Sequence, residues 1–280
     1  YVNQLSPKGS TNGGEGIKDA YRVAGQNYKA AGNNRVLLVT DGDFNLGISN
    51  QEELTELVRN EAKAGVFLSA IGVGSRNYNE ANLENLAKQG DGTYDYLGSY
   101  YDANKVFIED FNKFFAVAKD VKIQVEFNPE VVRKYRLIGY ENRVMDNSEF
   151  SNDSTDSGDL NSDQSVTALY ELEMVDSINN NLKAVDLRFK YKRIEENESN
   201  TLNVEVKNNS VDFINASENF RFAAGISGFG LEMKNSQYKG NLTMEEVSEI
   251  IENSKSFDPG GHRTSLIQLI EIYRSLKGLE

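Results

Sequence analysis

Apolar residues in the first 118 positions alternate between helical spacing and short continuous runs. Helical spacing predicts amphipathic helices over residues 12–31, 49–65, 83–87 and 107–115. Continuous aliphatic runs predict strands over residues 36–39, 66–73 and 93–97, and such runs are typical of strands covered on both faces. Because helices and strands alternate, we expect an α/β fold with a parallel sheet. Ligands of such folds bind at the carboxyl ends of the strands.

From Val121 onward, the apolar period changes from helical to two. This alternation predicts antiparallel strands with one solvated face, over residues 121–127, 131–140, 166–175, 185–191 and 202–206. Helical patterns return at residues 217–233, after a Thr243–Glu246 capping box, and at residues 266–276. We therefore expect a boundary near residue 118. Residues 1–118 form the α/β domain, and residues 119–280 form an antiparallel β-sandwich with C-terminal helices, an α+β arrangement.

Two segments of the second half depart from simple amphipathic patterns. The helix at 217–233 is apolar around most of its circumference, so we expect it to cover the sheet, and removal of the residues after Val211 to expose that sheet. The segment 146–163 contains six acidic residues and no basic one. It is typical of a solvated, mobile loop, with a calcium-binding loop as the alternative.

Composition excludes several classes of function. The 280 residues carry 43 Asp plus Glu against 30 Lys plus Arg, a net charge of −13, which disfavours nucleic acid and anionic membranes as partners. Neither a signal segment nor a run of about 20 apolar residues is present in the sequence. With no Cys and a single His, only metal sites built from oxygen ligands remain easy to form.

Three motifs of the first half carry a family resemblance: Gly9–Ile17, Val36–Gly42 and Gly65–Gly74. Together they resemble the von Willebrand factor type A domain, a Rossmann-like fold. The family builds a metal-ion-dependent adhesion site from three loops. Thr11 matches the second loop and Asp41 the third. The first loop, Asp-x-Ser-x-Ser, is not found where the resemblance requires it, so the domain is expected to be truncated at its N-terminus.

The resemblance implies a non-enzymatic, adhesion-type module that binds a protein partner. In the intact domain, Mg²⁺ (or Mn²⁺ or Ca²⁺) would take a carboxylate from the partner in its open coordination position. A Thr hydroxyl and one carboxylate are too few ligands for a hard cation, so this fragment should bind the ion weakly or not at all. The alternative is a structural or assembly subunit of an envelope complex with a vestigial metal site.

Other motifs in the same residues fit less well. Asp41 to Glu52 resembles an EF-hand loop, but Leu46 stands where the turn requires Gly. Gly9 to Gly14 has the glycine spacing of a P-loop, but Glu15 stands where the Lys must be. Singly, Thr11 is compatible with a helix N-cap and Asp41 with a turn acceptor.

The second half resembles the C-terminal extension that follows the type A domain in a family of bacterial cell-envelope proteins. The matching motifs are Ile138–Arg143, Val166–Glu171 and Phe220–Ala224. This resemblance implies an extracytoplasmic location without direct membrane insertion. His262 is the only candidate imidazole base, but no nucleophile elbow accompanies it. We therefore predict no enzymatic activity, and we expect His262 to be an exposed or a capping residue.

Overall fold

The structure is a computed structural model that describes residues 12–30, 32–42, 51–75, 78–140, 144–153, 155, 157–175, 182–196 and 198–278. The chain divides into two compact units. One contains Tyr1–Gln124, Asp146–Ser165 and Arg188–Leu202, and the other contains Val125–Met145, Val166–Leu187 and Asn203–Glu280. Residue 118 lies inside strand β4 (Ala116–Phe127), and the domain boundary near it stays a prediction.

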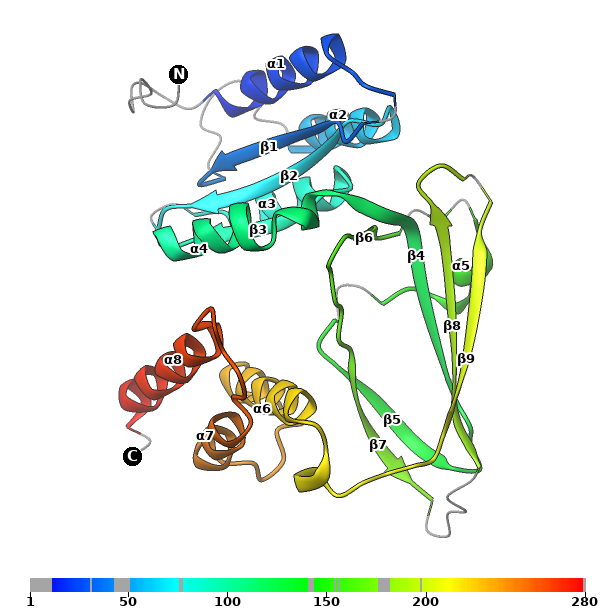
Figure 1. Cartoon of the computed structure of the whole chain (residues 1–280), viewed down its shortest axis with the longest axis vertical. Helices are drawn as coiled ribbons and strands as arrows, with labels where there is room; N and C mark the ends of the chain where they lie inside the picture. Colours follow the sequence, from blue (N-terminus) through cyan, green and yellow to red (C-terminus); the bar gives the residue numbers. More distant parts are fainter. Residues whose placement is uncertain are drawn as a thin grey trace. The chain divides into compact units, whose positions relative to one another are not determined.

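The first unit contains a parallel sheet. Strands β1 (Arg35–Thr40), β2 (Phe67–Val73) and β3 (Tyr94–Leu97) lie side by side in this order (Figure 1). Helices α1 (Gly13–Gln26), α2 (Gln51–Lys63) and α3 (Glu80–Gln89) precede them in turn. The predicted α/β fold with a parallel sheet is therefore confirmed.

One face of this sheet packs against the helices. The strand register sets Val36 beside Leu68, and both belong to a buried cluster. Its helical members come from all three helices: Ile17, Tyr21, Leu54, Val58, Leu83, Leu86 and Ala87. Burial of each large aliphatic side chain contributes about 1.5–3 kcal/mol, so this face supplies most of the unit's apolar stabilisation.

The opposite face is covered unevenly. Ile71 of β2 packs with Val106 and Phe114, which follow helix α4 (Tyr100–Asn104) in a π-helical segment, Lys105–Glu109, and a 3-10 segment, Phe111–Phe114. The continuous helix predicted over 107–115 is therefore wrong. This cover lies over β2 and β3, whereas Leu37 and Val39 of β1 are 41% and 54% exposed. Full cover of the strand at 36–39 is also wrong.

The remaining strands form two further sheets, one with four strands and one with two. One sheet has the order β6-β4-β8-β9, and β5 pairs antiparallel with β7. Their bounds are β5 Val132–Ile138, β6 Leu160–Asn161, β7 Leu169–Met174, β8 Lys183–Arg193 and β9 Asn200–Lys207. The predicted antiparallel sheets with C-terminal helices are confirmed. Packing of the sheets as a sandwich stays a prediction.

The C-terminal helices share a core of their own. Helices α6 (Glu218–Met233), α7 (Met244–Asn253) and α8 (His262–Lys277) bury Phe222, Phe229, Met244, Val247, Ile251 and Ile270 together (Figure 1). The predicted Thr243–Glu246 capping box starts α7. The buried residues of α6 therefore pack against α7 and α8, and cover of the sheet by this helix stays a prediction.

Candidate functional site

Asp41 lies at the carboxyl end of β1, in a turn that its neighbours fix. The backbone N–H of Gly42 donates to Thr40 Oγ1 (3.2 Å), and the N–H of Asn79 donates to the Asp41 carbonyl (3.0 Å). Gly42 has φ +80°, and a Cβ there would lie 2.8 Å from the Asn79 carbonyl oxygen. Only glycine fits this turn, because other residues rarely adopt such a φ and would collide with that oxygen.

Helices α2 and α3 hold the same turn from the other side. Asn82 Nδ2 donates to the Gly42 carbonyl (3.2 Å), and Gln51 Nε2 donates to Asn82 Oδ1 (3.1 Å). Asn79 caps α3 by accepting from the Asn82 N–H. The turn that carries Asp41 is therefore connected to both helices by side-chain hydrogen bonds.

Asp41 lies at the carboxyl-end edge of the parallel sheet, which is the edge at which α/β folds bind ligands. A Cβ added to Gly74, directly after β2, would lie 3.8 Å from the Asp41 Cβ, so Asp41 stands next to the end of the neighbouring strand. Thr11 lies outside the described residues. Within the described ranges, no group of three or more His, Cys, Asp or Glu side chains could hold a metal. The roles of Thr11 and Asp41 as metal ligands therefore stay predictions.

Tyrosines pack near this edge, and the sequence reading overlooked them. The ring of Tyr78 covers Gly72, and its hydroxyl contacts that of Tyr94, which donates to Glu80 Oε1 (3.4 Å). Burial raises the pKa of Tyr78 and of Tyr94, so both hydroxyls are neutral. Tyr96 donates to the Gly74 carbonyl (2.8 Å). A glycine inside an otherwise apolar strand was the available signal, since it allows close approach of another group.

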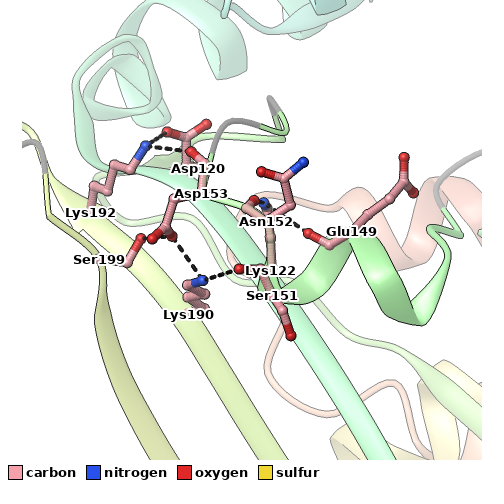
Figure 2. A network of polar contacts seen from close by, with 9 residues as sticks. All are labelled: Asp120, Lys122, Glu149, Ser151, Asn152, Asp153, Lys190, Lys192 and Ser199. Atoms are coloured by element: carbon pink, nitrogen blue, oxygen red, sulfur yellow. Dashed lines mark hydrogen bonds and ion pairs between the residues drawn. The ribbon is translucent and has the colours of Figure 1, made fainter.

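A second cluster of polar groups surrounds helix α5 (Asn147–Ser151) (Figure 2). Lys122 of β4 is 3% exposed, and its Nζ donates to the carbonyl oxygens of Glu149 (3.2 Å) and Asn152 (2.6 Å). Burial lowers the pKa of Lys122. These carbonyls end the short helix, where cations are favourable. The buried ammonium therefore acts as a C-terminal cap supplied by a strand.

Two lysines of β8 bind the residues that follow α5 (Figure 2). Lys190 Nζ lies 2.8 Å from a carboxylate oxygen of Asp153 and donates to the Ser151 carbonyl (3.1 Å). Lys192 Nζ lies 2.7 Å from Asp120 Oδ2 and donates to the Asp153 carbonyl (3.1 Å). Charge-assisted hydrogen bonds of this kind are stronger than neutral ones.

This network corrects part of the interpretation of 146–163: Asp153 has counter-charges in the structure, whereas mobility of the segment stays a prediction. Helix α5 starts with a capping box formed by Asp146 and Glu149, and the Asp153 carboxylate also accepts from Ser199 Oγ (2.6 Å). The counter-charges come from strands distant in sequence, which a local charge count misses. The signal was present as lysines at alternate, polar positions of β4 and β8. Among these oxygens, the Asp153 carboxylate and the carbonyls of Glu149 and Asn152 are bonded to ammonium groups. A calcium-binding loop stays an untested alternative.

His262 is the first residue of α8, and the cap at this helix is another side chain. The Asp258 carboxylate accepts from the N–H groups of Arg263 (3.2 Å) and Thr264 (2.8 Å), and from Thr264 Oγ1 (2.8 Å). Asp258, not His262, therefore supplies the predicted capping interaction. The pKa of Asp258 is lowered: burial raises it, but the hydrogen bonds from Thr264 and Arg263 outweigh burial.

Family comparison defines the class of protein. Residues 1–114 match the model of the von Willebrand factor type A domain, and residues 112–276 match the model described as "Uncharacterized protein YfbK, C-terminal". The type A resemblance is thereby confirmed, and type A domains generally mediate protein interactions and are typically non-catalytic. Because the second match covers more than half of the chain, the chain belongs to the YfbK C-terminal family.

A curated relative is the uncharacterized protein YfbK of Escherichia coli (strain K12). It is 36% identical over 297 residues, which include 97% of this chain and 50% of the relative. The chain therefore spans about half the length of this relative.

Solved structures whose backbone was matched to this chain include a von Willebrand factor type A protein from Catenulispora acidiphila. It has a TM-score of 0.40 and 15% identity, over 91% of this chain and 62% of that chain. The ArnB paralog VWA2 from Sulfolobus acidocaldarius gives 0.38 and 12%, over 99% of this chain and 72% of that one. Scores this low carry no argument about the site. In the described part of the chain, no helix has the length and apolar character needed to cross a membrane.

Proposed function

We propose that this chain is part of a protein-binding module whose intact type A domain recognises its partner through a divalent cation. Asp41 and Thr11 would be two of the ligands, and the remaining ones would come from an Asp-x-Ser-x-Ser loop outside residues 1–280. Mg²⁺ suits such a set of hydroxyls and carboxylates, and Mn²⁺ or Ca²⁺ could replace it. A carboxylate of the partner protein would complete the coordination.

The observation that carries this proposal is the placement of Asp41. Its carboxyl group stands at the carboxyl end of a parallel strand, beside Gly74, on a turn connected to α2 and α3. Networks of this kind hold a ligand in place before the ion arrives, which reduces the ordering cost of binding. An extracytoplasmic, cell-envelope location without membrane insertion is part of the same proposal, and cell fractionation would test it.

Calorimetric titration of Mg²⁺ tests the metal site. We expect binding to a form that contains the upstream loop, little binding to residues 1–280 alone, and a marked loss in Asp41→Asn of the longer form. Thr11→Ala should cause a smaller loss, because it removes a neutral ligand. Asp19→Asn is the matched control, since Asp19 is exposed on α1 in an ion pair with Arg22. Strong binding by residues 1–280, or unimpaired binding by Asp41→Asn, would show that the site lies elsewhere.

The alternative is a structural or assembly subunit in which the metal site is vestigial. The network around α5 supports it, because there the Lys122, Lys190 and Lys192 side chains are used to hold neighbouring backbone and carboxylate oxygens. An upstream segment that lacks Asp-x-Ser-x-Ser, combined with no Mg²⁺ binding in the titration, would support this alternative.

A further inference from the structure

Strand β9 is the last strand of its sheet, and its outer edge is open. The sheet has the order β6-β4-β8-β9, so β8 is the neighbour on one side (Figure 1). Along the part of the chain that the structure describes, no strand pairs with the other side. Every side chain from Thr201 to Lys207 is exposed. An edge of this kind presents unpaired backbone groups to other chains.

The direction of the backbone groups follows from one hydrogen bond. The N–H of Asn208, next to the end of β9, donates to the Leu182 carbonyl beside β8 (2.9 Å). In an antiparallel strand the N–H and C=O of a residue point to the same side, and successive residues alternate. Val206 and Val204 therefore direct their backbone groups toward β8. Asn203 and Glu205 direct theirs toward the open edge.

This edge carries only part of the protection by which proteins usually block strand addition, because its charged residues are Glu205 and the terminal Lys207. Residues 200–207 include no Pro, and their alternate side chains Leu202, Val204 and Val206 are apolar. These three are 54%, 39% and 41% exposed. The carboxylate of Glu205 lies 3.7 Å from Lys183 of β8, so part of its charge is compensated within the chain. Long apolar edges with little such protection favour pairing with another strand.

We propose that β9 pairs antiparallel with β9 of a second copy of this chain, across a two-fold axis at Val204. The argument is that the sequence of β9 complements itself. With the axis at Val204, Leu202 lies opposite Val206 of the second copy and Asn203 lies opposite Glu205. The apolar side chains then stack on one face, and outward backbone groups meet outward backbone groups.

Neighbouring registers are less favourable. A shift by one residue sets outward-pointing groups opposite inward-pointing ones and loses the hydrogen bonds. An axis at Glu205 sets two carboxylates directly opposite each other, which is repulsive. An axis at Asn203 sets Val206 opposite Asn200 of the second copy and loses an apolar pair. Only the axis at Val204 satisfies both the hydrogen bonds and the side chains.

The expected association is weak and reversible. An interface limited to one strand edge is smaller than the roughly 1,200 Å² of a stable specific interface. Each copy also carries a net charge of −13, which opposes association. The dimer should therefore form with increasing protein concentration, rather than persist on dilution.

A single introduced cysteine tests the register, because the chain contains no other Cys. Val204→Cys would place its two copies opposite each other on the axis. There a non-hydrogen-bonded pair has a Cα–Cα distance of about 4.5 Å, within the range of a disulfide. Leu202→Cys is the control, because Leu202 faces Val206 of the second copy rather than itself. Leu202 is also the more exposed of the two, at 54% against 39%, so random collision would favour the control.

We expect mild oxidation to crosslink Val204→Cys at least roughly tenfold faster than Leu202→Cys. Equal rates, or faster crosslinking of Leu202→Cys, would overturn the proposal. Sedimentation supplies a second measurement. Asn203→Pro removes an outward N–H without a loss of bonds to β8, so it should abolish the dimer and keep the circular dichroism spectrum. Asn203→Ala keeps the N–H and should keep both the dimer and the spectrum.

Other occupants of the edge give different outcomes. If the chain stays monomeric at all concentrations and the outward β9 amides exchange freely, no strand pairs with the β9 edge. A monomer whose outward amides, such as that of Glu205, are protected in a longer polypeptide shows that a strand of the same polypeptide occupies the edge. Both results reject the second copy.

Discussion

At the scale of single residues, the most informative groups are buried or fixed polar side chains. Lys122 is buried although lysine rarely is, and its position is stable because carbonyl oxygens accept from its ammonium. Asp41 is fixed by the turn at Gly42 and by contacts from Asn79 and Asn82. At Lys122 the contacts hold the ammonium group itself, whereas at Asp41 they hold the backbone that carries the carboxylate.

Replacement of Lys122 by Met should destabilise the fold by about 2 kcal/mol, because it leaves the carbonyls of Glu149 and Asn152 without their donor. Methionine has a similar length, so most of the packing is kept. Lys18→Met on the exposed face of α1 is the control and should change stability by less than about 0.5 kcal/mol. Urea unfolding of both variants measures the difference. An equal effect of the two changes would contradict a capping role for Lys122.

Asp153 should contribute a pH-dependent part of stability. The hydrogen bond from Lys190, followed by that from Ser199, lowers the pKa of Asp153 below its usual value. A lowered folded-state pKa gives stability that is present above the unfolded pKa of about 3.9 and is lost as pH falls through the folded value. Asp153→Asn should therefore be less stable than the parent at pH 7 and should approach it in acid below about pH 4. Asp19→Asn controls for the lost charge, and a gap that stays constant to low pH would refute this.

At the scale of elements, the sequence predicted what local pattern determines. Periodicity located α6 and β2, and the Thr243–Glu246 spacing located the start of α7. Long-range contacts determined the rest. The segment after α4 changes from π-helical to 3-10 geometry as Val106 and Phe114 pack on Ile71. Helix α5 forms where lysines from other strands meet it. For the site, sequence located Asp41, but the contacts that hold its turn depend on packing of α2 and α3.

The close packing of α6 on α7 depends on glycine. A Cβ on Gly225 would lie 2.5 Å from Ile251 Cγ1 and 3.1 Å from Ile250 Cγ2. Gly225→Ala should therefore destabilise the protein by about 1–3 kcal/mol, despite the better helix propensity of alanine. Gly230 lies in the same helix with nothing within 4 Å of its Cβ position, so Gly230→Ala should stabilise by about 0.5–1 kcal/mol. Thermal unfolding should separate the two variants in opposite directions, and a shared sign would contradict the packing argument.

At the scale of the whole molecule, the buried apolar residues that the structure describes form separate clusters rather than one continuous core. One cluster joins the buried side chains of α6, α7 and α8. A separate cluster contains Val131, Val132 and Ala184. With separate clusters, removal of the segment that forms one of them should destabilise the other less than it would in a shared core. Connections between them are polar or aromatic at the surface, such as Arg136 over the Tyr238 ring at 4.4 Å.

Removal of the residues after Val211 tests this arrangement. The sequence alone suggested that truncation would uncover the sheet and cause aggregation. Because the core of α6 is shared with α7 and α8, we now expect residues 1–211 to stay soluble, with a cooperative thermal transition within about 5 °C of the corresponding transition in the parent. The loss of the Arg136–Tyr238 contact should cost little, as a cation–π pair with a solvent-exposed ring contributes about 0.5–1 kcal/mol. Tyr238→Ala in the full chain is the matched control for that contact. Aggregation of the truncated chain, with Tyr238→Ala unaffected, would mean that the helices do cover the sheet.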